Sequence, residues 1–554
     1  MNTVDNNTSQ RPALIFNAAS ARKWVKTLPT SNLGEMTRQL YFYMVELNSN
    51  PMPPLTRIEI AEIIRPFSEM SLENLKKHLE VSSFPLPLRS KKIFNLNQSL
   101  LLEMAGAYQL SALDMLTKGE KNKKLLLLPI GRSMNYMGRV LINTYGLYIK
   151  PRKALWRDIH HLYLIACENN IQHLTIPEKS SVDYACSTIE FYYKHISLLA
   201  LALPHSIRVG EVFRLNRFFH KIIDYIDIYT DSSSTQGKYA HIAMLNSDEP
   251  PTLMPVAELL NSPTVRLFDL NKVLKILSVF CKETDNTPLG TNDTFPMLNH
   301  SLAERLISSL TTVQNRRFKR FPRNEKTPVV SHLRNIVEVL KSEQQDNNIE
   351  DSADDLFHEL TFGDLNASTW INNEPVENKH PNVKLRAWEI QNSCSEGYGL
   401  LWKNEDPSGV RVGELIAVQD PEDDSHKWQI GTIRWMEFAQ HKGLAVGIEL
   451  LSPSALPLSI NNVTNRTISQ KLPINGLLLP VIEGLKEKPY LILPDYIFNI
   501  GDIIEVQTGN HTEHLEIINL DESYGAFSVC EYISSVKEET HEVSDDYNDI
   551  WEAL

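Results

Sequence analysis

The sequence predicts an α+β multidomain protein that begins with an all-α helical scaffold, continues with an antiparallel β-barrel and ends with a smaller β module. Three observations predict this order. Apolar residues recur with helical spacing between about residues 34 and 314. From residue 383 onward the apolar period shortens to two, which is typical of strands, and turn residues separate the segments. A polar, acidic stretch at about 341–379 lies between them and is expected to be an exposed insertion.

Composition limits the class of protein. The chain has 554 residues, and its 55 Lys and Arg against 68 Asp and Glu give a formal net charge of −13. At about 150 residues per domain, this length predicts roughly three to four domains. A content of 42% hydrophobic and 22% charged residues is typical of a folded protein, and it excludes collagen, a wholly disordered chain and a disulfide scaffold.

Cysteine usage and the start of the chain predict a cytoplasmic protein. The five cysteines lie far apart and form no CxxC pair, as expected in a reducing compartment. Residues 1–11 are polar and lack the basic start and apolar core of a signal peptide. No apolar run reaches the roughly 18 residues that cross a bilayer, so we expect no transmembrane segment.

The expected helical scaffold covers 34–314 and follows a flexible N-terminus at 1–33. Its first helix places Leu40, Tyr43, Met44 and Leu47 on one face, at the spacing of an amphipathic helix. Prolines fall mostly between the helical stretches, where helix breakers belong. A small β excursion is expected at 238–255. The further helical stretches lie at 54–64, 96–116, 134–147, 156–166, 182–203, 211–228, 270–280 and 302–313.

The β region divides into a barrel at 315–453, a C-terminal module at 454–532 and an acidic tail at 533–554. Residues 328–339 are rich in β-branched side chains and predict a strand. Five short period-two stretches with turns imply a small antiparallel barrel. These barrel strands are expected at 383–391, 398–402, 415–418, 428–436 and 443–450. Those of the module are expected at 476–481, 490–493, 503–508, 514–519 and 526–532. The tail ends in Trp551 and Leu554, which fit either a docking motif for a partner or a frayed end.

One basic run stands out in this acidic chain. Residues 316–323 read Arg-Arg-Phe-Lys-Arg-Phe-Pro-Arg, so that five of eight are basic, and they lie between the last expected helix and the β region. Guanidinium groups present planar forks that suit phosphate oxygens and can stack on bases. The run is therefore a candidate anion site. A solvated basic linker is the alternative, because such runs are common.

A second candidate stretch separates two expected strands. It runs from residue 392 to residue 400 and combines small polar residues with glycines. Gly397 and Gly399 permit a positive φ and the close approach of a ligand. Asn392 offers a paired donor and acceptor, and Ser393 and Ser395 add hydroxyl groups. Such a turn can read a base edge, although an ordinary hairpin turn has the same composition.

Together, the two stretches resemble the PilZ domain, the family of bacterial cyclic di-GMP receptors. The family pattern is RxxxR before a six-stranded barrel, then D/N-x-S-x-x-G between two of its strands. Arg316 and Arg320 fit the first element, and Asn392 and Gly397 fit the ends of the second. The stretches at 411–416, 428–435 and 445–451 resemble later strands of the family. The resemblance covers about residues 314–453 and implies a PilZ-like six-stranded antiparallel barrel with cyclic di-GMP as its ligand.

The resemblance also implies roles for individual residues. Arg316 and Arg320 would bind phosphate and the O6/N7 edge of guanine, with Arg317 or Arg323 assisting. Asn392, Cys394 and Ser395 would lie at a guanine edge, and Gly397 would allow the turn. Two features depart from the family pattern: Cys394 stands where the family has serine, and the long acidic insertion separates the two motifs.

We therefore expect a cytoplasmic effector that binds cyclic di-GMP and signals by contact with an unknown protein partner through the helical scaffold. The sequence contains no HExxH, GxSxG, GxxxxGK[ST] or GxGxxG pattern, so we do not expect an enzyme. One alternative is an interaction scaffold whose barrel is degenerate and binds no nucleotide. The other is a nucleic-acid binder that uses the run at 316–323, which the overall acidity disfavours.

Overall fold

The computed structural model divides the chain into two compact units. The helical unit is Met1–Asn315 with Asn404–Gly409 and Glu437–Leu444, and the barrel unit is Arg316–Lys403, Val410–Met436 and Ala445–Leu554. The structure describes residues 16–79, 84–177, 187–230, 237–259, 262–284, 291–313, 319–346, 383, 385–404, 406–423, 427–439, 442–463, 474–480, 489–495, 497–508, 511–521 and 525–534.

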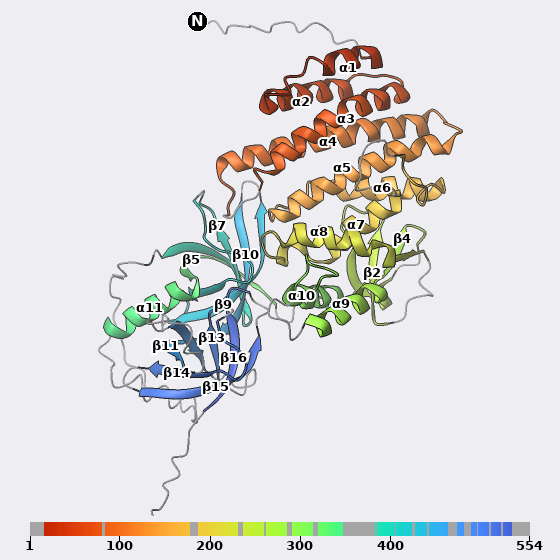
Figure 1. Cartoon of the computed structure of the whole chain (residues 1–554). Helices are drawn as coiled ribbons and strands as arrows, with labels where there is room; N and C mark the ends of the chain where they lie inside the picture. Colours follow the sequence, from red (N-terminus) through yellow and green to blue (C-terminus); the bar gives the residue numbers. More distant parts are fainter. Residues whose placement is uncertain are drawn as a thin grey trace, which may run out of the picture. The chain divides into compact units, whose positions relative to one another are not determined.

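The helical unit stacks its helices one after another in sequence order (Figure 1). The helix expected around Leu40 is α2, which begins after Asn32, whose Oδ1 accepts a hydrogen bond of 3.1 Å from the Glu35 amide. Its apolar face is buried in the core of the unit. The helices before the small sheet are α1 (Ala18–Val25), α2 (Leu33–Ser49), α3 (Pro54–Lys76), α4 (Leu88–Thr117), α5 (Leu127–Gly146), α6 (Leu155–Glu168), α7 (Ile189–Leu201) and α8 (Glu211–Ile222).

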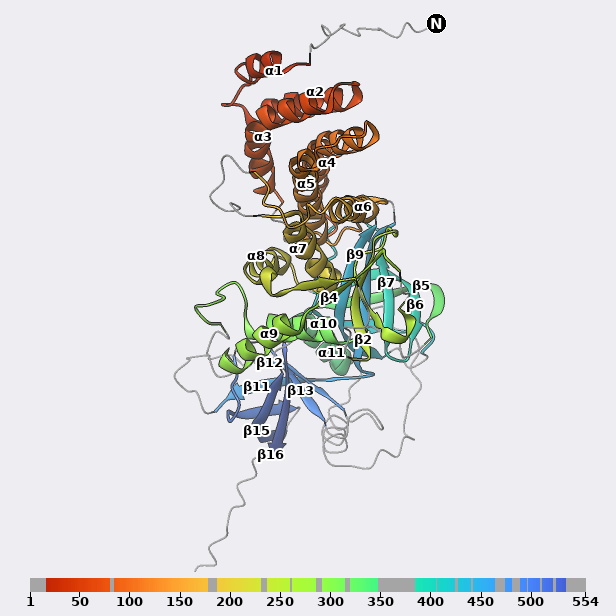
Figure 2. The same ribbon diagram turned by 90° about the vertical axis from the view of Figure 1, so that its right-hand side faces the viewer.

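A four-stranded antiparallel sheet follows α8, where the sequence indicated only a small β excursion. Its strands are β1 (Asp227–Tyr229), β2 (Tyr239–Met244), β3 (Thr252–Pro255) and β4 (Val265–Asp269), in the order β1-β4-β2-β3. The helix predicted at 211–228 ends at Ile222; Ile223–Tyr225 form a 3-10 turn, and Asp227–Tyr229 then pair with β4. Helices α9 (Asn271–Thr284) and α10 (His300–Thr311) complete the unit and pack against each other (Figures 1 and 2).

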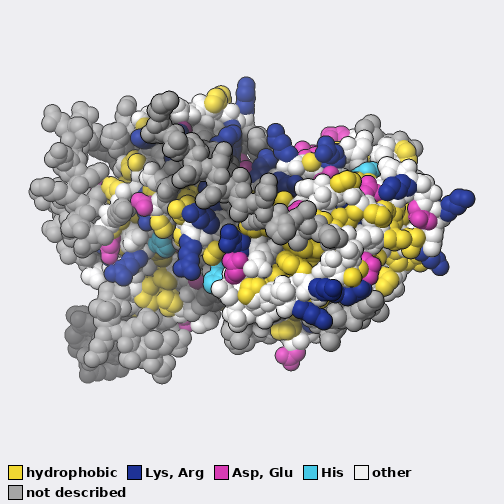
Figure 3. Space-filling view, turned by 90° about the horizontal axis from the view of Figure 1, so that it is seen from above, with side chains coloured by type: hydrophobic (Ala, Val, Ile, Leu, Met, Phe, Trp, Pro, Cys, Tyr) yellow, Lys and Arg dark blue, Asp and Glu magenta, His cyan; other side chains and the backbone are white. Residues whose placement is uncertain are grey.

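Part of the helical surface is apolar. Seen from above, a band of apolar side chains crosses one face of the molecule (Figure 3). Among the described residues of α2, α3 and α4, the large apolar side chains with the greatest exposure are those of Phe42, Leu55, Met70, Leu88 and Leu110.

The first barrel of the barrel unit has six strands and is closed, as the resemblance implied. They are β5 (Phe321–Ser331), β6 (Arg386–Cys394), β7 (Gly397–Trp402), β8 (Leu415–Gln419), β9 (Trp428–Ala439) and β10 (Gly443–Ser452). The cyclic order is β10-β7-β6-β5-β8-β9.

The C-terminal module is a second closed six-stranded barrel (Figure 2). It consists of β11 (Leu456–Asn462), β12 (Ile474–Leu479), β13 (Tyr490–Leu493), β14 (Ile503–Thr508), β15 (His511–Asp521) and β16 (Ser528–Ser534). In both barrels the first strand pairs with the second and fourth, the third with the second and sixth, and the fifth with the fourth and sixth. The prediction missed β11, because Pro457 interrupts its pattern and proline is disfavoured within sheets.

A helix, α11 (Leu333–Asp346), connects β5 to the acidic stretch. The strand predicted at 328–339 is therefore wrong beyond Ser331, where His332 turns the chain with a φ of 75°. Residues 341–346, expected in the insertion, form the end of α11. The helix packs against strands of both barrels, and the Trp428 indole Nε1 donates a hydrogen bond of 2.8 Å to Glu343. The rest of the predicted insertion and most of the acidic tail lie outside the described residues.

Candidate functional site

The second sequence motif folds as a hairpin between β6 and β7. Asn392 pairs with Gly399, Ser393 with Tyr398, and Cys394 with Gly397. The turn of this hairpin is fastened to β10, because the Leu450 amide donates a hydrogen bond of 2.9 Å to the carbonyl oxygen of Glu396. The motif residues therefore lie in a hairpin that is hydrogen-bonded to β10 of the first barrel.

Arg320 lies beside this hairpin. Its Nη1 donates a hydrogen bond of 2.8 Å to Oδ1 of Asn392. The contact follows from strand pairing, since β5 begins at Phe321, which is opposite Ser393, and Pro322 is opposite Asn392. The structure thus brings together one residue from each sequence motif, although 72 positions separate them. Arg316 and Arg317, which the resemblance also implies as ligand contacts, lie outside the described residues.

The two glycines of the motif leave room for neighbouring groups of the barrel. Neither has a positive φ, and no ligand is needed to explain them. A Cβ on Gly397 would lie 1.9 Å from the backbone oxygen of Ile448, and a Cβ on Gly399 would lie 2.7 Å from Oδ1 of Asn392. Gly397 therefore lets β10 approach the hairpin, and Gly399 leaves room for the Asn392 side chain.

Cys394 and Ser395 occupy the end of the hairpin. Cys394 is the last residue of β6, is half-buried and carries a free thiol. Ser395 is exposed in the turn. Cys394 and Ser395 therefore lie two and three residues after Asn392, and Cys394 is at the position where the family pattern has its serine.

The resemblance implies Arg323 as an assisting arginine at the ligand, but its side chain is engaged with carboxylates of the barrel. Its side chain is only 6% exposed, and its guanidinium contacts both carboxylate oxygens of Asp420 at 2.9 and 3.0 Å. It also pairs with Glu325. Because two carboxylates already neutralise this buried cation, Arg323 supports the barrel and is not a partner for phosphate.

The same network includes Tyr398 of the hairpin strand β7. The Tyr398 hydroxyl donates a hydrogen bond of 2.6 Å to Asp420 and lies 2.9 Å from the side chain of Gln429. Burial and the neighbouring Asp420 raise the pKa of Tyr398 above its ordinary value. Burial alone would raise the pKa of Asp420, but hydrogen bonds from Arg323 and Tyr398 lower it. Spacing in the sequence gave no sign of this network, because Asp420 is 97 positions from Arg323.

The arrangement of Arg320 beside Asn392 is suited to binding a ligand. A guanidinium has five N–H donors in a planar fork, and one donor of Arg320 is engaged with Asn392. Phe321, the next residue, exposes 61% of its surface. Among the described residues, no group of three or more His, Cys, Asp or Glu side chains is placed to hold a metal ion. Nor does any described helix have the length and apolar character required to cross a membrane.

A closed six-stranded barrel that brings an arginine before its first strand onto an Asn-x-x-x-x-Gly hairpin defines a PilZ-type domain. Comparison with known proteins agrees: residues 331–457 match the family described as "Cyclic-di-GMP receptor FimW, middle PilZ domain". Residues 19–255 match the N-terminal domain of the same family and residues 460–535 its C-terminal β-barrel domain. Residues 331–457 therefore form a PilZ domain, and the chain is similar to this family in three successive segments.

One curated relative is the cyclic-di-GMP receptor FimW of Pseudomonas aeruginosa. It is 24% identical to this chain over an alignment that covers 92% of this chain and 90% of the relative. No solved structure matches the chain.

Proposed function

We propose that this protein is a cytoplasmic receptor that binds cyclic di-GMP at the first barrel and passes the signal on by contact with another protein. The observation that supports the proposal most is the hydrogen bond between Arg320 and Asn392, because it joins a residue of the basic run to a residue of the hairpin motif. The family match and the name of the curated relative support the same ligand. We assign no catalytic step to the protein.

The proposed ligand contacts follow from the chemistry of the side chains. Arg316, Arg317 and Arg320 supply charge and planar donors for the two phosphates and for the O6 and N7 atoms of guanine. Asn392, Cys394 and Ser395 line the hairpin side, where the amide of Asn392 contacts a base edge. The exposed ring of Phe321 offers a face on which a base can stack. Gly397 acts indirectly, since it holds the hairpin against β10.

Isothermal titration of the full chain with cyclic di-GMP tests this proposal, beside the Arg316→Ala/Arg320→Ala variant and an Arg334→Ala control. Arg334 is a suitable control because its side chain is 82% exposed on α11. We expect saturable binding by the wild type and the control, and loss of binding in the double variant. No binding by the wild type would mean that the barrel is degenerate and that the chain is an interaction scaffold.

A further inference from the structure

The outer face of β14, β15 and β16 is the clearest unassigned surface of the barrel unit. Ile500, Ile518 and Ile533 expose 64%, 38% and 48% of their surface on this isoleucine face. The Gly501 amide donates a hydrogen bond of 2.7 Å to the carbonyl oxygen of Ile517, so Ile500 and Ile518 adjoin the same backbone contact. Large aliphatic side chains gathered on one face of a sheet mark a surface that another protein can cover.

Strand pairing shows which side chains share the isoleucine face. Leu515 and Ile517 of β15 are buried in the core of the second barrel, so Glu516 between them points outward. Glu516 is opposite Ile533 of β16 and opposite the half-buried Ile503 of β14, and residues paired in this way share a face. An isoleucine therefore lies on each side of this glutamate.

The isoleucine face is not the side of the barrel that builds the shared core. That core uses mainly residues of β12 and β13, and α11 packs against β11 and β12. The main contacts of β15 are with β14 and β16, its neighbours in the barrel (Figure 2). Ile518 lies in a β-bulge between Ile517 and Asn519, a feature that redirects a side chain from the regular alternation.

The charge around the isoleucine face has one sign. Residues 489–534, which contain β13 to β16, include eight Asp or Glu and no Lys or Arg. Glu516 is opposite Ile533, and Glu531 lies two residues before Ile533 and therefore on the same face of β16. The neutral side chain of Asn519 donates a hydrogen bond of 3.4 Å to Glu531. Such a surface attracts a positively charged partner and repels nucleic acid and anionic lipid.

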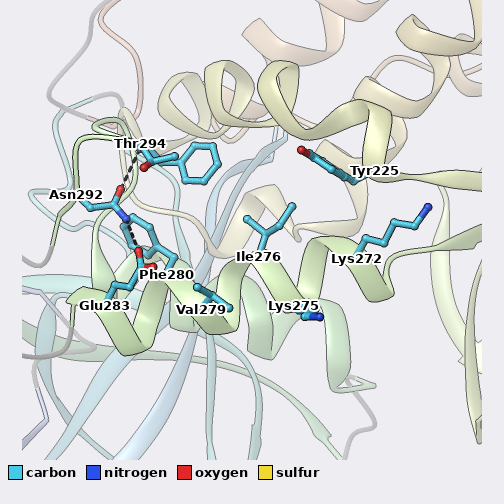
Figure 4. Close-up of a pocket in the computed structure, with 10 residues that line it drawn as sticks. Tyr225, Lys272, Lys275, Ile276, Val279, Phe280, Glu283, Asn292 and Thr294 are labelled. Carbon is cyan, nitrogen blue, oxygen red and sulfur yellow. Dashed lines mark hydrogen bonds between the residues drawn. The ribbon is translucent and has the colours of Figure 1, made fainter.

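A groove on α9 of the helical unit lacks this selectivity. Its floor is apolar, but Lys272 and Lys275 lie toward the first turn of the helix and Glu283 toward the last turn (Figure 4). Charges of both signs beside an apolar floor do not select one kind of partner. The isoleucine face does, because carboxylates alone supply its charge.

We propose that the isoleucine face binds a basic segment of a partner protein, in which Lys or Arg residues flank aliphatic side chains. The aliphatic side chains cover Ile500, Ile518 and Ile533, and the cations lie beside Glu516 and Glu531. Because the barrel is closed, the segment packs on the face of the sheet and does not add a strand to it. This contact is separate from the one expected of the helical scaffold, and it does not depend on cyclic di-GMP.

Selection of short random peptides displayed on phage tests this docking. The target is the full chain without nucleotide, after the library has been depleted on the Ile518→Ser/Ile533→Ser chain. Both isoleucines are exposed, which makes this variant compatible with folding. We expect the recovered peptides to carry a net positive charge beside aliphatic residues. Recovery of no peptide, or of neutral or acidic peptides only, overturns the proposal.

Fluorescence anisotropy of the recovered peptides, synthesised with a label, then tests the carboxylates. We expect Glu516→Lys/Glu531→Lys to raise the dissociation constant at least about tenfold. Added salt is expected to weaken binding to the wild type, because it screens exposed charges. Unchanged binding by this variant would contradict the proposed pairing of charges.

Glu73→Lys/Glu304→Lys is the matched control. It makes the same change in net charge at exposed side chains of α3 and α10 in the helical unit. We expect it to leave peptide binding unchanged. Equal losses in the two charge-reversed chains would show that the peptides respond to the net charge of the whole chain, and the proposal would be wrong.

Discussion

Asp420 is the side chain on which the polar network of the first barrel converges. It accepts hydrogen bonds from Arg323 and Tyr398, and it neutralises an arginine that is almost fully buried. Removing one partner of a buried ion pair costs more than the pair contributes, because the remaining charge is left without compensation. We therefore regard Asp420 as a stability residue, even though it pairs with an arginine of the basic run.

The stability that Asp420 contributes depends on pH in a definite direction. Its pKa in the folded state is lowered from 3.8, so its contribution is complete above about pH 4 and is lost as the pH falls through the lowered value. We expect Asp420→Asn to lower the melting temperature near neutral pH, and the difference from wild type to shrink on acidification. Thermal unfolding across this pH range measures the effect.

Glu422→Gln is the control for this prediction. Glu422 is 69% exposed and lies 3.5 Å from the Arg323 guanidinium. An exposed pair contributes about 1 kcal/mol or less, so this variant should shift the melting temperature far less. If the difference between Asp420→Asn and wild type were the same at every pH, the proposed role of the ionised carboxylate would be wrong.

Gly397 leads to a second prediction at the residue scale. Because an added Cβ would meet the Ile448 backbone oxygen at 1.9 Å, Gly397→Ala must displace β10 or the hairpin. We expect a loss of about 1–3 kcal/mol in the free energy of unfolding, measured in urea. Gly34→Ala serves as the control, because a Cβ there would lie 3.6 Å from Oδ1 of Asn32 and alanine favours the helix. Equal stability of Gly397→Ala and wild type would contradict this close approach.

At the scale of single residues, the sequence predicts which residues form the two motifs better than it predicts where their side chains point. The basic run and the hairpin motif were both recognised, and Arg320 and Asn392 do meet. The run could not show that Arg323 turns inward, because its partner Asp420 belongs to a distant strand. The glycine spacing predicts close approach by a ligand, and it gives no sign that β10 and Asn392 lie against these glycines.

Among the elements, α11 packs against both barrels of the barrel unit. Leu333, Ile336 and Val337 are buried in a core that also includes residues of β8 and β9 in the first barrel and β12 and β13 in the second. Lys341 extends the contact, since its Nζ donates a hydrogen bond of 2.9 Å to the Ser459 hydroxyl of β11. The helix therefore gives the two barrels a shared core.

This shared core predicts that a single substitution in α11 destabilises both barrels. We expect Ile336→Ala to cost about 2–5 kcal/mol, the usual range for removing a buried isoleucine side chain. In differential scanning calorimetry, both barrel transitions should move to lower temperature together. Arg334→Ala on the exposed face should shift them little. A shift confined to one barrel transition would contradict the shared core.

The errors in predicting elements have identifiable causes. Residues 333–340 combine β-branched side chains, which favour a strand, with the spacing of a helix, and tertiary packing settles such cases. Strand β11 was missed because of its proline. The four-stranded sheet was underestimated, because β1 and β4 are short and pair across a long separation in the chain. Long amphipathic helices such as α2, in contrast, were visible from spacing alone.

For the whole molecule, the two barrels have one topology but different sequences before their first strands. Arg320 immediately precedes β5, whereas residues 445–455, which precede β11, contain no Lys or Arg. The order of helical scaffold and β-barrels is predictable, because the spacing of apolar residues changes from helical to a period of two along the chain. The shared topology of the two barrels is not predictable from the sequence, because a barrel closes by pairing strands that are far apart in sequence. We therefore expect the nucleotide to bind the first barrel only.

A thermodynamic cycle tests the central claim, that Arg320 and Asn392 form one site for cyclic di-GMP. The dissociation constant is measured by titration calorimetry for the wild type, Arg320→Ala, Asn392→Ala and the double variant. We predict that each single variant weakens binding at least about tenfold and that the double variant loses less than the sum, because the two residues in contact act together. Wild-type affinity in Asn392→Ala, or losses that add in full, would contradict the account.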